Sequence, residues 1–109
     1  MAKQKNTMPP TLLVTRSVLS GQRKAKWFFR EKGIDKHDTG WRVVGDGDTQ
    51  GYINQERNVL VIDIDTFSSV EPLIYKIVDL PLDTELERIE DESGIKFKDC
   101  HTEEFITIE

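Results

Sequence analysis

The sequence is nearly without the residues that build most metal and disulfide sites. Cys100 is the only cysteine in 109 residues, so no internal disulfide can form. The only two histidines are His37 and His101, no CxxC pair accompanies them, and the adjacent Cys100 and His101 are poorly placed to bind one metal. The chain is therefore predicted to need no cofactor, and its single thiol favours a reducing, cytoplasmic location.

Long apolar runs are also missing. No stretch approaches the about 18 apolar residues of a membrane span, and "TLLV" near the start is too short for the core of a signal peptide. The glycine patterns that bind phosphate and the motif around a nucleophilic serine are absent as well. We therefore expect neither a membrane protein nor an enzyme.

Charge is present but unevenly distributed along the chain. The net charge is -5, and it divides into +7 for residues 1–44, -4 for residues 45–78 and -8 for residues 79–109. An acidic final third disfavours nucleic acid as a partner, because nucleic acid requires a basic face. The alternatives are a solvated dipolar surface, or an acidic end that attracts a basic protein.

The first part of the chain reads as strands. Residues 1–10 are predicted to form a disordered arm, and residues 11–109 a single α+β domain. β-branched and aromatic residues predict strands at 12–17 and 24–31, joined as a hairpin by "SGQR", and a third strand at 41–44. The fourth, at 58–64, has apolar residues on both faces, which is typical of a central strand covered on both sides.

The last part mixes helix and strand. Residues 65–81 have helical features, with Pro72 suited to a first turn and Pro81 ending the helix. Residues 82–99 fit either a helix or a hairpin of 85–89 with 95–99, and the turn residues of "EDESG" favour the hairpin. Residues 105–109 fit an edge strand or a tail. The sum is an α+β fold: a mostly antiparallel sheet with one or two helices packed on one face.

The segment 45–57, "GDGDTQGYINQER", partly matches the calcium loop of an EF-hand. Asp46 and Asp48 would be the first two ligands, and Gly51 the glycine of the turn. However, Arg57 stands where a bidentate Glu is required, and the flanking segments read as strands rather than helices. A strand-connecting loop is therefore predicted, with a cation site at Asp46 and Asp48 as the alternative.

Aromatic and charged residues gather in "WFFRE" and "HDTGWR". Trp and Arg dominate the binding energy of many protein interfaces. The candidate binding residues are therefore Arg30, Glu31, Asp38, Trp41 and Arg42. In the alternative, both arginines pair with Glu31 or Asp38 to fix the loop, and the pattern favours a core position for both tryptophans, Trp27 and Trp41.

These motifs resemble those of a small bacterial domain that was first catalogued without a function and later described as a family of immunity proteins associated with polymorphic toxin systems. The specific element is Asp-x-Gly-Trp-Arg at residues 38–42, where Thr39 stands at a position that is usually Ser. The resemblance spans roughly residues 12–99, and beyond Pro81 the family's Gly and aromatic residue are missing. Other matching positions are Phe29, Arg30, Glu31, Gly45, Asp46, Tyr52, Asn58, Asp65, Thr66, Phe67 and Pro72.

The resemblance implies an α+β fold without enzymatic activity and, for some members, a cognate protein toxin as partner. It also adds Tyr52 to the candidate binding residues. The expected function is a non-catalytic protein-binding module that neutralises a toxin by occluding it. The alternative is a housekeeping or regulatory domain that binds a small ligand near Trp41, and both a monomer and a dimer are open.

Overall fold

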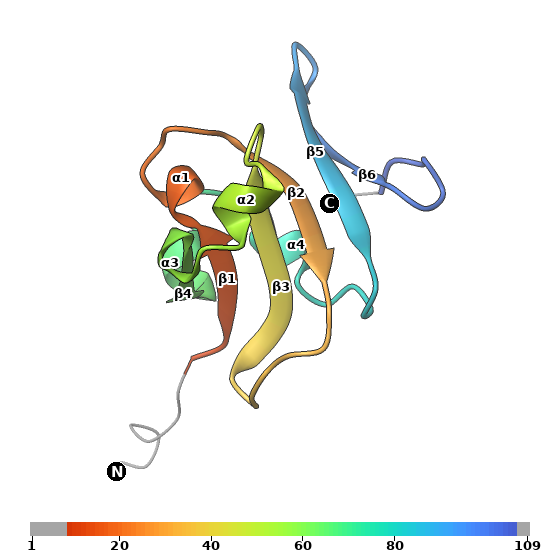
Figure 1. The fold of residues 1–109 in the computed structure, drawn as a ribbon. Helices are drawn as coiled ribbons and strands as arrows, with labels where there is room; N and C mark the ends of the chain where they lie inside the picture. The colour runs from red at the N-terminus through yellow and green to blue at the C-terminus, as the bar shows by residue number, and fades with distance from the viewer. Residues whose placement is uncertain (1–8, 107–109) are drawn as a thin grey trace.

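Six strands form one mixed sheet in the order β4-β1-β3-β2-β5-β6 (Figure 1). The computed structural model describes residues 9–106, so most of the predicted arm at 1–10 lies outside the described residues, as does the end of the segment 105–109 that fits an edge strand or a tail. All neighbouring pairs are antiparallel except β1 with β3, which is parallel. The strands are β1 (Thr11–Thr15), β2 (Ala25–Arg30), β3 (Asp38–Gly45), β4 (Val59–Asp63), β5 (Glu85–Asp91) and β6 (Gly94–Asp99).

Short helices lie on both faces of the sheet and at its ends. The core lies on one face, where α3 (Ile64–Phe67) and α4 (Ile74–Ile77) pack their apolar residues onto the strands. On the other face α2 (Gln50–Ile53) lies in front of β3 (Figure 1). A further turn, α1 (Arg16–Leu19), follows β1, and a 3-10 turn, η2 (Glu56–Asn58), precedes β4. The predicted α+β fold with a mostly antiparallel sheet is confirmed.

Phe28 lies at the centre of the core. It is fully buried, and its ring meets Phe67 of α3 and Phe97 of β6 edge-on, at centroid distances of 6.3 and 5.2 Å. Such T-shaped aromatic pairs add to the free energy of burial. Trp41, also fully buried, confirms one of the two predicted core tryptophans.

Several predicted elements are confirmed. The strands at 24–31 and 41–44 are β2 and part of β3, and the favoured hairpin at 85–99 is β5 with β6. The helical segment 65–81 forms two single turns rather than one helix, because Asp63 caps the first through its bond to the Thr66 N–H and the chain reopens before Pro72. The loop predicted at 45–57 does connect two strands, and it contains α2, which Thr49 caps.

Two predictions about strand pairing are wrong. The strand at 12–17 forms no hairpin with 24–31, because the chain turns into α1 after Thr15 and β1 instead pairs with β3 and β4. The strand at 58–64 is not central, since β4 ends the sheet and Val61 is 62% exposed. Apolar residues on both faces of a strand indicate that both faces are covered by other side chains. They do not determine whether a neighbouring strand pairs with the backbone on each side.

The predicted core position of Trp27 is also wrong, because its side chain is 39% exposed on the sheet face opposite the core. The β2–β3 register shifts between Ala25 and Trp27, so Ala25 and Phe28, three residues apart, both face the core. Simple alternation along the sequence does not anticipate such a shift. Within residues 9–106, no helix combines the length and apolar character that crossing a membrane requires.

Replacing the central aromatic ring tests this description of the core. We expect Phe28→Ala to lower the free energy of unfolding by about 3–5 kcal/mol, because a fully buried ring is lost and a cavity remains. Phe105→Ala, at a position that is 53% exposed, is the matched control and should cost about 1 kcal/mol or less. Urea denaturation of both variants measures the difference, and equal losses would contradict the assignment.

Candidate functional site

The first residues of β3 are bent at Gly40. Its φ is 91°, a conformation that glycine adopts at little cost. Asp38 lies opposite Thr11 of β1, and Arg42 lies opposite Leu13. The chain therefore advances four positions along β3 while it advances two along β1, which is an irregularity in the pairing. A Cβ atom on Gly40 would lie 1.9 Å from the carbonyl oxygen of Glu31. The bend therefore requires glycine, and it carries the Asp38 side chain back over Arg42.

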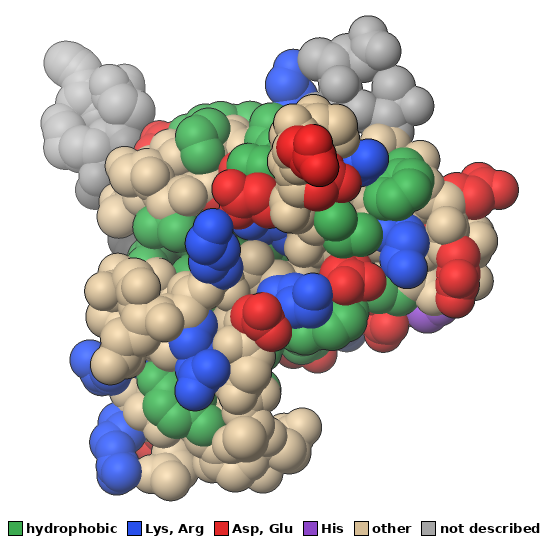
Figure 2. Space-filling view, turned by 90° about the horizontal axis from the view of Figure 1, so that it is seen from above, with side chains coloured by type: hydrophobic (Ala, Val, Ile, Leu, Met, Phe, Trp, Pro, Cys, Tyr) green, Lys and Arg blue, Asp and Glu red, His purple; other side chains and the backbone are tan. Residues whose placement is uncertain are grey.

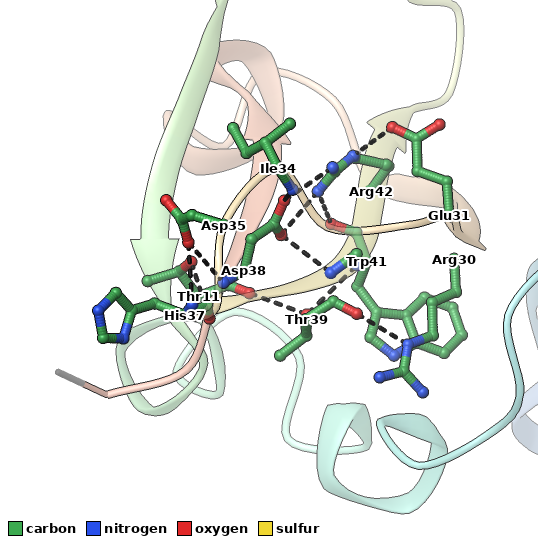
Figure 3. Close-up of polar contacts among 11 residues, drawn as sticks. Thr11, Arg30, Glu31, Ile34, Asp35, His37, Asp38, Thr39, Trp41 and Arg42 are labelled. Atoms are coloured by element: carbon green, nitrogen blue, oxygen red, sulfur yellow. Dashed lines mark hydrogen bonds and ion pairs between the residues drawn. The ribbon is translucent and has the colours of Figure 1, made fainter. Parts of the chain in front are cut away.

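A buried ion pair results from this bend (Figure 3). The two guanidinium NH₂ nitrogens of Arg42 each donate to one carboxylate oxygen of Asp38 at 2.9 Å. Its Nε donates to Glu31 Oε2 at 2.7 Å. The Arg42 and Asp38 side chains are only 7% and 4% exposed, whereas that of Glu31 is 57% exposed. A buried guanidinium needs such complete pairing, because an unpaired one would lose the solvation energy of its charge.

Asp38 also fixes the loop at residues 31–37. Its carboxylate accepts from the backbone N–H groups of Ile34 and Gly40, both at 2.9 Å. Burial by itself raises the pKa of this carboxyl, but the hydrogen bonds from Arg42 and the two N–H groups outweigh burial and lower the pKa to about 2. Burial lowers the pKa of Arg42, but its hydrogen bonds to Asp38 and Glu31 and the charges of these two carboxylates outweigh burial and raise the pKa. Both groups therefore stay charged at neutral pH.

Trp41 and Arg30 connect the strands to the segment that follows α4. The Trp41 indole N–H donates to the carbonyl oxygen of Val78 at 2.9 Å. Arg30 donates to the carbonyl oxygens of Thr39 at 2.8 Å and Leu80 at 2.6 Å. A buried indole N–H and a half-buried guanidinium each need hydrogen-bond acceptors, and these carbonyl oxygens provide them. Five of the six candidate binding residues thus meet in one network. The alternative in which the arginines pair with Glu31 or Asp38 is confirmed for Arg42 and wrong for Arg30, which bonds to backbone carbonyls.

Tyr52, the sixth candidate, lies apart from this network. It is half-buried on α2, beside a hollow shared with Ser17, Arg23 and Asp48. Its position in α2 follows from Thr49, whose hydroxyl caps the helix at the Tyr52 N–H. The structure therefore separates Tyr52 from Arg42, although the resemblance placed both among the candidates.

Asp46 and Asp48, the alternative cation ligands, have different surroundings. Asp46 is exposed. The buried carboxylate of Asp48 accepts from Ser17 Oγ at 2.7 Å and from the Gly45 N–H at 2.8 Å, and Arg23 Nε lies 3.4 Å away. Burial raises its pKa, but the hydrogen bonds from Ser17, Thr15 and Gly45 more than offset that and leave it lowered. Among residues 9–106, no group of three or more His, Cys, Asp or Glu side chains could hold a metal ion.

An open hollow lies on the sheet face opposite the core. It has a volume of about 580 Å³, and we call it the Trp27 hollow. The side chains that define it are Trp27, Phe29, Val44, Ile53, Glu85 and Cys100. Burial first, and then the negative charges of Glu85, Glu87 and Asp99, raise the pKa of the Cys100 thiol, so the surroundings of this thiol are electronegative.

The Trp27 hollow is a candidate site that no motif of the sequence marks. Its residues come from β2, β3, α2, β5 and the turn after β6, and only the strand order brings them together. The available signal was the aromatic run "WFFRE", because three successive aromatic residues in a strand cannot all face one core. Trp27 and Phe29 consequently face the opposite side from Phe28.

Comparison with known proteins gives one match. The family model described as Immunity protein Imm33 domain matches residues 12–98, which runs from β1 to β6 and includes the network around Arg42. No curated protein and no solved structure matches the chain.

The bend at Gly40 can be tested with a pair of glycine variants. We expect Gly40→Ala to cost at least about 2 kcal/mol of stability, because the new Cβ collides with a backbone oxygen and the residue keeps a positive φ. Gly51→Ala, in α2 with open space around the new Cβ, should be neutral or stabilising by up to about 1 kcal/mol. Thermal unfolding compares them, and a tolerated Gly40→Ala would show that the bend is not required.

The Asp38 carboxylate predicts a loss of stability in acid. Because its pKa is about 2 in the folded chain and near 3.8 otherwise, its contribution is complete above about pH 4 and disappears as the pH falls through about 2. The contribution is about 2 kcal/mol. Asp38→Asn should cost about 3–5 kcal/mol at pH 7, since Arg42 loses its buried partner, and should flatten the acid dependence. Denaturation between pH 2 and pH 7 measures both, and an unchanged slope in the variant would refute the assignment.

Proposed function

Because this chain belongs to the Imm33 family of immunity proteins, whose model spans residues 12–98, we propose that it neutralises a cognate protein toxin by binding and occluding it, without catalysis of its own. We also propose which surface of the chain binds the toxin. The observation that carries it is the Trp27 hollow, where aromatic side chains remain accessible on a rigid sheet.

The Trp27 hollow has the composition of an interface centre. Trp27 exposes 39% of its surface, and half-buried Phe29, Val44 and Ile53 continue the apolar area beside it. A second hollow, lined by Leu13, Phe29, Val44, Ile53 and Val59, extends it along the same face. Partly exposed aromatic residues on strands lose little conformational entropy when a partner covers them, so they are efficient anchors.

The charges around this face favour a basic partner. Glu85 and Glu31 border the two hollows and expose 55% and 57% of their side chains. Part of the acidic final third is already neutralised within the chain, because β2 lies beside β5 and Lys26 meets Glu87 at 2.9 Å. Acidic and basic side chains accordingly alternate on the end of the molecule seen in Figure 2. The net charge of -5 still attracts a basic toxin, such as a nuclease, over longer distances.

The network around Arg42 contributes to this surface indirectly. Trp41 and Arg42 are buried and present almost no surface, so their proposed part in binding is to hold neighbouring groups. Arg42 fixes Glu31, which lines the second hollow together with Phe29. Glu31 and Tyr52 are the candidate residues whose side chains a partner could contact most directly.

Capture of the partner and substitution of its contacts test the proposal. We expect affinity capture from the native host, read by mass spectrometry, to return a toxin. Trp27→Ala should weaken its binding by about 30-fold or more, because a hot-spot aromatic contributes about 2 kcal/mol or more. Glu85→Lys should also weaken binding and should slow association most at low salt.

The matched control is Phe105→Ala, which removes an exposed aromatic ring outside the Trp27 hollow and should bind the toxin like the wild type. Calorimetric titration of each variant gives the affinities, and circular dichroism confirms that each is folded. If capture returns no protein, the proposed role is wrong. If Trp27→Ala binds as tightly as the wild type, the toxin binds at another surface.

A further inference from the structure

The strand β4 leaves one edge of the sheet uncovered. It pairs with β1 on one side, and no other strand among residues 9–106 lies on its outer side. The opposite edge of the sheet is different, because Phe105 forms a bridge to Lys98 and the Ile106 N–H donates to the carbonyl oxygen of Phe97 at 3.0 Å. Within residues 9–106, β4 is therefore the edge strand to which no further segment pairs, whereas β6 is partly covered.

The residues of β4 do not protect that edge. Edge strands usually carry a lysine, a proline or a bulge that prevents pairing with another chain. The strand Val59–Asp63 reads "VLVID", contains no lysine or proline, and follows β1 in an unbroken register. Val61, its middle residue, is 62% exposed.

The backbone groups on the bare edge form a self-complementary set. The Ile64 N–H donates to the Pro10 carbonyl at 2.9 Å, and antiparallel bonding alternates, so Leu60 and Ile62 face β1 while Val59, Val61 and Asp63 face outward. The Val59 N–H already bonds to the Glu56 carbonyl, and Asp63 begins α3 with its carbonyl. The outward groups that remain are the N–H and C=O of Val61, the C=O of Val59, and the N–H of Asp63, which also interacts with its own carboxylate.

A second copy in antiparallel orientation fits this set when a two-fold axis passes midway between the Val61 residues of the two copies. The N–H and C=O of Val61 then bond to the same groups of the other copy, and the Asp63 N–H meets the Val59 C=O. The same arrangement brings unlike charges together. Arg57 lies two residues before β4 and Asp65 two residues after it, so this register sets Arg57 of each copy opposite Asp65 of the other, with Glu56 beside Arg57.

We propose that β4 is a homodimer interface, in which two copies pair these strands across a two-fold axis at Val61 and join their sheets into one. Because the edge at β6 is partly covered by residues 105 and 106, the pairing stops at two copies and does not extend into a fibre. The Trp27 hollow lies on the face of the sheet rather than on this edge, so the dimer leaves it open.

Proline at the centre of β4 is the sharpest test. Val61→Pro removes the outward N–H, and proline is accepted on an edge strand at such a position, so the variant should stay folded. Val61→Thr keeps the N–H and the branched side chain and is the matched control. In sedimentation equilibrium we expect the wild type and Val61→Thr to be dimers at high micromolar concentration, and Val61→Pro to be a monomer. A monomeric wild type, or a dimeric Val61→Pro, would overturn the proposal.

Disulfide capture tests the register without relying on proline. In a Cys100→Ser background, Val61→Cys places two thiols opposite each other, where hydrogen-bonded Cα atoms lie about 5.5 Å apart and a disulfide can form. We expect mild oxidation to link this variant into a dimer, and to leave the control Ile95→Cys, which is also in a Cys100→Ser background, unlinked. Failure of Val61→Cys to link, or equal linking of both, contradicts pairing at Val61.

The homodimer and the binding of a toxin at the Trp27 hollow can be refuted independently of each other. Trp27→Ala should weaken toxin binding and leave the dimer intact, whereas Val61→Pro should dissociate the dimer and keep the Trp27 hollow. If a captured toxin instead binds along β4, Val61→Pro will reduce toxin binding while the wild type alone is monomeric, and the homodimer is refuted.

Discussion

The need to compensate one buried charge organises much of this structure. The Arg42 guanidinium lies inside the sheet, and its pairing with Asp38 is possible because Gly40 bends β3. That bend sets the parallel register of β3 with β1 and brings the Glu31 backbone against Gly40. The loop at 31–37 and the bonds of Trp41 and Arg30 to the segment after α4 follow from the same segment of β3. The Asp-x-Gly-Trp-Arg element is thus a structural unit whose residues depend on one another.

The two faces of the sheet differ in character. One packs Phe28 and Trp41 against α3 and α4, and supplies most of the hydrophobic stabilisation. The other keeps Trp27 and Phe29 accessible beside acidic side chains, which suits recognition of another protein. An immunity protein needs both, because a partner can be held in one geometry only by a surface that does not yield when it binds.

Local patterns predicted the elements that are made locally. The β5–β6 hairpin follows from its turn residues, and the core position of Trp41 from the apolar strand around it. The place of β4 at the edge, and the pairing of β1 with β3 rather than β2, depend on contacts between distant segments and left no local trace. Trp27 was misplaced because the register shift after Ala25 interrupts the alternation of faces. In the candidate site, the pairing of Arg42 with Glu31 and Asp38 agrees with the alternative offered by the sequence, whereas Arg30 bonds to carbonyl oxygens instead of a carboxylate. The Trp27 hollow depends on the strand order, which no local pattern shows.

The strand order also determines how the chain reaches its native state. The β5–β6 hairpin closes over only two residues, Glu92 and Ser93, so it can form early at a small entropic cost. The pairing of β1 with β4 must close a loop from Thr15 to Val59, and the parallel pairing of β1 with β3 cannot form as a tight turn. Contacts of such sequence separation form late and slow folding. The β1–β4 side of the sheet is consequently completed last, and in a partly folded chain it is the region most open to pairing with the wrong strand.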